Sequence, residues 1–108
     1  MISVCITTYN GADVILTQIN SILPQIDATD EIVISDDGST DGTVKILEDL
    51  KDSRIRIIKG PCMGSPIPNF ENALKHAKGD YIFLSDQDDK WMEGKVETIT
   101  KKFKEGYD

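Results

Sequence analysis

The chain carries the stretch Tyr81-Ile82-Phe83-Leu84-Ser85-Asp86-Gln87-Asp88-Asp89, an apolar run that ends in three carboxylates within four positions. The apolar residues lie between two helical patterns, which is typical of a buried strand in a parallel sheet. Like charges this close repel one another, so folding gains nothing from them. A divalent cation relieves the repulsion, and carboxylate oxygens suit Mg²⁺ or Mn²⁺. The alternative is a solvated acidic turn in which Asp89 stabilises the start of a helix.

Strand and helix patterns alternate along the rest of the chain. Three more strands are predicted at residues 2–8, 31–35 and 54–58. Apolar residues at helical spacing predict four helices, which carry Ile15, Ile19, Ile22 and Leu23; Val44, Leu47 and Leu50; Phe70, Ala73, Leu74 and Ala77 after a cap at Asn69; and Met92, Val96, Ile99 and Phe103. This βαβαβαβα order predicts an α/β fold: a Rossmann-like parallel sheet of about four strands with helices on both faces.

The third strand, Arg54-Ile55-Arg56-Ile57-Ile58, alternates charged and apolar residues, as an edge strand with one wet face does. It therefore predicts the strand order 3-2-1-4. Ligands of such sheets bind outside the carboxyl ends of the strands, where the order reverses. Tyr9, Asp37 and the 86–89 run follow strands one, two and four, and we expect them to meet there. Asp36, beside Asp37, is expected to brace its loop.

Composition and charge indicate one globular domain over residues 1–108, with 29% charged and 39% hydrophobic residues. The net charge of −7 argues against nucleic acid as a partner. No apolar segment is long enough to cross a bilayer, and Met1 leads straight into a strand without a signal sequence. Two cysteines form no disulfide framework, so we expect a reducing, cytoplasmic location, with Cys5 in the core and Cys62 in a loop.

The usual phosphate-binding motifs are missing. No G-x-G-x-x-G follows the first strand, and the sequence contains no G-x-x-x-x-G-K-[ST]. An acidic site can hold a diphosphate only when a divalent cation lies between the two. The sequence therefore predicts that metal and phosphate bind together.

Three motifs resemble glycosyltransferase family 2: ISVCITTYN at 2–10, ISDDGSTDGT at 34–43 and GDYIFLSDQDD at 79–89. The resemblance covers essentially the whole chain. It implies the N-terminal half of a GT-A fold and inverting transfer of a sugar from a UDP- or dTDP-linked donor. It also implies a saccharide or lipid-linked acceptor, a part in cell-surface polysaccharide synthesis, and a location at the inner face of the membrane.

The resemblance also assigns residues to the donor site. Thr7 and Tyr9 would contact the base, with Tyr9 stacked on it, and Asp37 would accept the N3–H of uracil or thymine. Asn72 resembles a family asparagine near the donor. The family often has an arginine beside this asparagine, where this chain has Glu71.

The metal would be Mn²⁺ or Mg²⁺. Asp86 and Asp88 match the Asp-x-Asp motif of the family, with Asp88 as the direct ligand and Asp86 near the ribose and the metal-bound waters.

No residue after Asp89 resembles the carboxylate that deprotonates the acceptor, since Glu93, Glu97 and Glu105 alternate with lysines as a solvated helix face does. We therefore assign no catalytic residue and expect the chain to be the donor-binding part of a longer transferase. Strand four is then an open apolar edge, and we expect self-association through it.

Two other functions fit parts of the pattern. A phosphoacceptor receiver domain also has an acidic pair after a strand, but that pair follows its first strand and a lysine lies further on. A nucleotide- or metal-binding module without catalysis would share every donor-site residue named above.

Overall fold

Four parallel strands form one sheet in the order β3-β2-β1-β4, in a computed structural model that describes residues 1–62 and 66–86. The strands are β1 (Ile2–Thr8), β2 (Glu31–Asp36), β3 (Ile55–Lys59) and β4 (Tyr81–Asp86). The predicted order is therefore confirmed. A receiver domain has the order 2-1-3-4-5, in which strand three lies beside strand one, so the receiver alternative is wrong.

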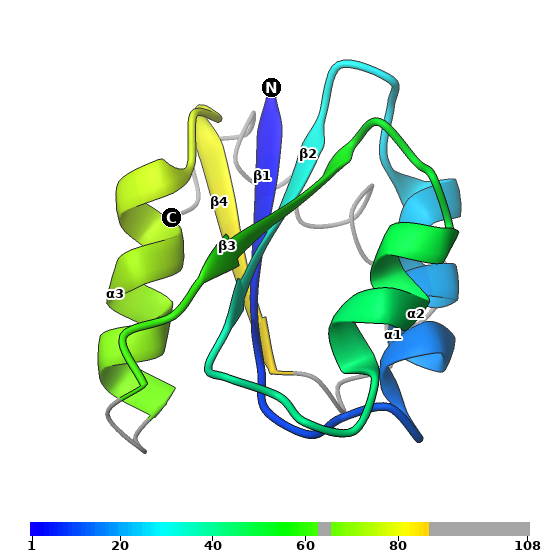
Figure 1. Cartoon of the computed structure of the whole chain (residues 1–108). Helices are drawn as coiled ribbons and strands as arrows, with labels where there is room; N and C mark the ends of the chain where they lie inside the picture. Colours follow the sequence, from blue (N-terminus) through cyan, green and yellow to red (C-terminus); the bar gives the residue numbers. More distant parts are fainter. Residues whose placement is uncertain (63–65, 87–108) are drawn as a thin grey trace.

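Helices cover both faces of the sheet, as the alternating pattern predicted (Figure 1). Helix α1 (Ile15–Ile22), the 3₁₀ turn η1 (Leu23–Gln25) and α2 (Thr43–Asp49) lie on one face, and α3 (Pro66–His76) lies on the other. All seven residues of β1 are buried because both faces of this central strand are covered.

The larger core cluster lies between the sheet and α1 with α2. Ile15, Ile19 and Ile22 of α1 repeat at helical spacing and are fully buried against β1 and β2. The smaller cluster, on the α3 face, consists of Cys5, Val33 and Ala73. Burial raises the pKa of the Cys5 thiol to about 11, which keeps it neutral.

Helix α3 begins earlier than predicted. It starts at Pro66, since proline suits the first turn of a helix, where its missing N–H costs no hydrogen bond. Asn69 is therefore not a cap: it is buried, and its side chain donates to Ser35 O at 3.0 Å. Leu74, predicted on the buried face, is 38% exposed.

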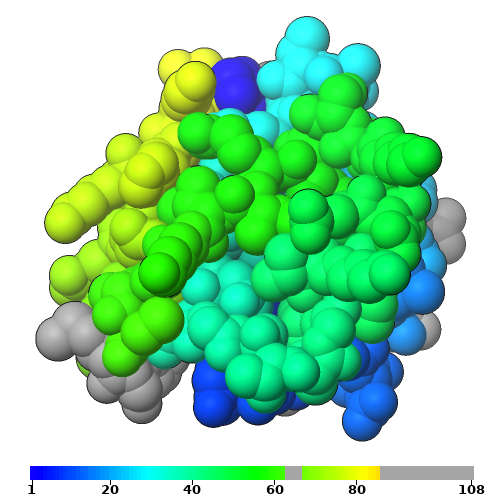
Figure 2. Space-filling view, viewed as in Figure 1, coloured from blue at the N-terminus to red at the C-terminus, as the bar shows by residue number. Residues whose placement is uncertain are grey.

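Strand β3 is an edge strand, but its arginines are not simply solvated. Arg56 donates to Glu31 Oε1 at 3.0 Å and to the carbonyl oxygen of His76. Arg54 precedes the strand and forms an ion pair with Asp52 at 2.9 Å. The space-filling view shows β3 and α2 together on the outside of the molecule (Figure 2).

The carboxyl ends of all four strands point to the lower edge of the molecule in Figure 1, and the loops that follow β1 and β2 gather there. No helix in the described part of the chain is long and apolar enough to cross a membrane. The predicted helix with Met92, Val96, Ile99 and Phe103 lies outside the described residues.

Candidate donor site

The ends of β1 and β2 bring together three residues predicted to bind the donor. Thr7 pairs in register with Ser35 of β2 and Asp86 of β4. Thr7 is 4% exposed and Tyr9 is 57% exposed, so the chain passes from core to surface within three residues. The Asp37 N–H donates to Thr8 O at 2.9 Å and holds the two strand ends together beyond the last register pair.

Asp36 braces the loop after β2, as expected. Its Oδ1 accepts the hydroxyls of Thr8 and Ser39, each at 2.6 Å. Its Oδ2 accepts the N–H groups of Gly38 at 3.2 Å and Ser39 at 2.9 Å. The carboxylate is buried, and four protein donors surround it, so its role is to shape the loop.

The remainder of this loop docks on the segment after β1. Asn10 N–H donates to Ser39 Oγ at 2.9 Å, and Asn10 Oδ1 accepts the Thr40 N–H at 2.8 Å. Asp41 Oδ2 accepts the Ala12 N–H at 3.0 Å. The hydroxyl of Thr43 holds the pKa of Asp41 below its ordinary value of 3.8. Tyr9 and Asp37 therefore extend from two loops that are fastened to each other.

Asp37 differs from its neighbour in that donors from the described residues reach only one of its two carboxylate oxygens. It is half-buried, and its Oδ1 accepts the N–H of Cys62 at 2.6 Å. Within the described residues, no donor contacts its Oδ2. A fixed carboxylate with one open oxygen can accept an N–H of a ligand, which is the role predicted for this residue.

Asn72 lies on α3 and is held by protein contacts. Its Nδ2 donates to Ser35 Oγ and to Lys59 O, both at 2.9 Å. A contact from Asn72 to the donor would therefore come from Oδ1, and its donor role stays a prediction.

The predicted metal ligands lie mostly outside the described residues. Asp86 ends β4 with its backbone paired opposite Thr7, but Asp88 is not described. Residues 1–62 and 66–86 contain no group of three histidine, cysteine, aspartate or glutamate side chains that could hold a metal ion. The metal assignment stays a prediction.

The turn after β3 contributes to the site in a way that the sequence does not reveal. The sequence predicts only that Cys62 lies in a loop, whereas in the structure its N–H is the described donor to Asp37. The contact joins residues 25 positions apart, and its donor is a backbone group that every residue except proline has. The residue type at position 62 therefore gives no indication of this hydrogen bond.

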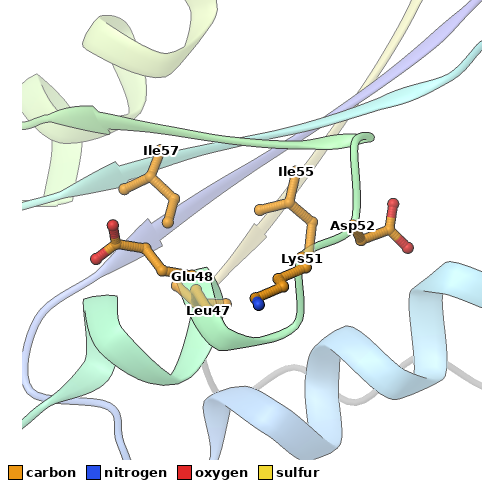
Figure 3. Close-up of a pocket in the computed structure, with 6 residues that line it drawn as sticks. All are labelled: Leu47, Glu48, Lys51, Asp52, Ile55 and Ile57. Atoms are coloured by element: carbon orange, nitrogen blue, oxygen red, sulfur yellow. The ribbon is translucent and has the colours of Figure 1, made fainter.

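A separate hollow lies between α2 and β3 (Figure 3), lined by Leu47, Glu48, Lys51, Asp52, Ile55 and Ile57. It contains none of the residues predicted for the donor, and we assign it no part in the site.

A family model described as Glycosyl transferase family 2 matches residues 3–108. Escherichia coli WfaP, described as a UDP-Glc:alpha-D-GlcNAc-diphosphoundecaprenol beta-1,3-glucosyltransferase, is 41% identical over 96 residues. That alignment covers 89% of this chain and 38% of WfaP. The chain spans about two fifths of the length of such curated relatives.

Solved structures share the fold. The crystal structure of S. aureus TarS 1-349 has a TM-score of 0.88 and 28% identity, over 96% of this chain and 32% of TarS 1-349. The same TarS segment is known in complex with UDP-GlcNAc. Mannosyltransferase PcManGT from Pyrobaculum calidifontis, solved with GDP-Man and Mn²⁺, has a TM-score of 0.76 and 25% identity, over 95% of this chain and 31% of PcManGT. The sheet described above is thus the one found in the matching part of these two proteins.

Proposed function

Because the chain belongs to glycosyl transferase family 2, we propose that it binds the donor in an inverting glycosyltransferase that uses a UDP- or dTDP-linked sugar. The observation that carries the proposal is the Asp37 carboxylate, held just beyond the carboxyl end of β2 by the Cys62 N–H on Oδ1, with no donor to Oδ2 among the described residues. Tyr9, which is 57% exposed, follows the neighbouring strand β1. WfaP, whose name gives UDP-Glc as its donor, supports a uridine nucleotide.

The base would be recognised by two side chains. Tyr9 offers an exposed aromatic face on which a pyrimidine stacks, a contact worth about 1–3 kcal/mol per base. Asp37 Oδ2 would accept the N3–H of uracil or thymine. Cytosine has no hydrogen at N3, and a charge-assisted hydrogen bond is worth roughly 1.5–3 kcal/mol, so selectivity for uridine or thymidine follows.

The remaining donor contacts lie along the same edge. Thr7 and Asp86 are register partners at the ends of β1 and β4, which suits contacts to the base and ribose. Carboxylates at the end of β4 suit a hard divalent ion, and Asp86 and Asp88 would hold Mn²⁺ or Mg²⁺, which supplies positive charge to the donor diphosphate. The described residues carry the donor side only, and we assign the catalytic base to none of them.

The acceptor follows from the relatives. WfaP is named for an acceptor that is a sugar diphosphate linked to undecaprenol, so we propose a saccharide or lipid-linked acceptor and a role in cell-surface polysaccharide synthesis. We propose that transfer to such an acceptor takes place at the inner, cytoplasmic face of a membrane.

Isothermal titration with UDP, dTDP and CDP tests the donor assignment, each in Mn²⁺, in Mg²⁺ and in EDTA. We expect UDP or dTDP to bind only with metal present and at least tenfold more tightly than CDP. Asp88→Ala should abolish the metal dependence, whereas Asp36→Ala should not. Equal binding of UDP with and without metal would contradict the metal role, and equal binding of CDP and UDP would contradict the role of Asp37.

A further inference from the structure

The turn after β3, residues 60–62, is built against the end of β2. Gly60 N–H donates to Asp36 O at 2.7 Å, and Cys62 N–H donates to Asp37 Oδ1 at 2.6 Å. A Cβ atom at position 60 would lie 2.5 Å from Asn69 Oδ1 and 2.9 Å from Asp36 O. Only glycine allows the turn to lie this close, so the Cys62 N–H is brought to Asp37 by close packing.

Cys62 itself has a backbone conformation that few residues adopt. Its φ is +56°, in the left-handed region that disfavours side chains with a Cβ, and β-branched ones most. An unfavourable conformation that persists in a folded protein is held there by its surroundings and is found most often at functional sites. Here the contact that accompanies it is the hydrogen bond to Asp37.

Fixing one oxygen of Asp37 has a consequence for base selection. With Oδ1 bound to the Cys62 N–H, rotation of the carboxylate is restricted, and Oδ2 would be offered to a ligand in one orientation. A carboxylate oxygen fixed in this orientation forms a hydrogen bond with the N3–H of uracil, whereas it repels the N3 lone pair of cytosine. A carboxylate free to rotate could instead accept from the exocyclic amino group of cytosine, and the discrimination would fall.

We propose that Cys62 is a positioning residue for nucleotide recognition, which acts through its left-handed backbone by holding Asp37 so that Oδ2 selects a base with an N3–H. This role rests on the proposed function of donor binding. The thiol has no part in it. The turn after the edge strand thereby sets the base preference of a carboxylate on the neighbouring strand.

Two substitutions separate the backbone from the thiol. Cys62→Gly and Cys62→Val both remove the sulfur and both keep the N–H, but glycine accepts a φ of +56° freely and valine resists it. We expect Cys62→Gly to bind UDP within about twofold of the wild-type protein. We expect Cys62→Val to bind UDP roughly tenfold more weakly and to lose most of the preference over CDP. Cys62→Ala, which removes the thiol and keeps an unbranched Cβ, should stay near wild type and controls for the sulfur. If Cys62→Val does not fold, the amide NMR comparison of the wild-type protein with Asp37→Ala decides the contact.

The measurements are titration calorimetry with UDP and CDP in Mn²⁺ and amide NMR of the nucleotide-free protein. The residue 62 amide proton should lie downfield in the wild-type and Cys62→Gly proteins, and move upfield in Cys62→Val and in Asp37→Ala. Equal UDP affinity of the glycine and valine variants, or equal loss in both, would overturn the proposal. A wild-type protein that bound no nucleotide would overturn the proposed function and with it the role in base selection, whereas the NMR result would still decide the contact between Cys62 and Asp37.

Discussion

Two neighbouring carboxylates, Asp36 and Asp37, have opposite surroundings, and their substitution should have opposite effects. Asp36→Ala removes the acceptor of four donors, so we expect the free energy of unfolding to fall by about 2–3 kcal/mol. Asp37→Ala removes a half-exposed side chain with one described donor, and should lower the free energy of unfolding by less than about 1 kcal/mol while weakening UDP binding at least tenfold. Urea unfolding and calorimetry on both variants measure the two effects. A stable Asp36→Ala protein would show that the loop does not depend on this carboxylate.

At the same scale, the sequence could predict where the donor-site residues lie, but it could not assign different roles to Asp36 and Asp37. The strand order and the turn residues put Tyr9 and Asp37 at one edge of the sheet, and the structure places them there. The distinction between Asp36 and Asp37 depends on which donors the folded loop brings within 3 Å, among them Thr8 from another strand. Contacts between residues distant in sequence, such as that of Cys62 with Asp37, leave no pattern in a local window.

At the scale of elements, Glu31 joins the start of β2 to the connection between α3 and β4. Its Oε2 accepts Ser3 Oγ at 2.6 Å and the Lys78 N–H at 2.7 Å, and its Oε1 accepts Arg56 at 3.0 Å. Gly79 N–H donates to the same Ser3 hydroxyl at 2.7 Å. The carboxylate thereby fixes the start of β4 relative to β1. The register between these two strands in turn sets the position of Asp86 at the end of β4.

Glu31 should make the stability depend on pH. Burial alone would raise the pKa of Glu31, but the hydrogen bonds from Ser3, Lys78 and Arg56 lower it below its ordinary value of 4.5. A lowered pKa in the folded protein means that the stabilisation is complete above the unfolded value and is lost as the pH falls through the folded one. We expect Glu31→Gln to lower the free energy of unfolding by about 2 kcal/mol near pH 7 and to flatten its decline below about pH 4.5.

Urea unfolding across this pH range measures the effect, and Asp80→Asn is the matched control. Asp80 pairs with the N-terminal amine at 3.2 Å, but its side chain is 82% exposed, so the substitution should change stability by less than about 0.5 kcal/mol. An equal change in both variants would contradict the role of Glu31.

The element boundaries show where sequence patterns are sufficient. The sequence patterns predicted all four strands to within two residues at each end. The central strands β1 and β2 are buried on both faces and read as continuous apolar runs, whereas β3 was recognised from its alternation of arginine and isoleucine. The predicted start of α3 was wrong because asparagine is a common helix cap, whereas the Asn69 side-chain amide donates to the backbone oxygen of Ser35 in β2. The sequence contains another indication of the start of α3, because proline is typical of the first turn of a helix and Pro66 occupies that position.

At the scale of the whole molecule, the sheet has two unlike edges. Strand β3 is lined by Arg56, whose guanidinium is engaged by Glu31, and it ends in an exposed Lys59. Strand β4 pairs with β1 on one side, and no strand of the described chain pairs with its other side. Ile82 and Leu84 of β4 are 42% and 54% exposed, so this edge combines apolar side chains with backbone groups that can pair with another strand.

We therefore predict that two copies of the chain associate through the β4 edge, since identical edge strands can pair across a two-fold axis. Sedimentation velocity over a concentration series should show the average mass rising for the wild-type protein. Leu84→Lys places a charge on the edge and should leave a monomer at every concentration. Leu16→Lys is the matched control, because Leu16 is 41% exposed but belongs to α1 and not to the β4 edge, and this variant should associate as the wild type does. A wild-type protein that stays monomeric at high concentration would refute the open edge, and equal loss of association in both variants would show that the contact lies elsewhere.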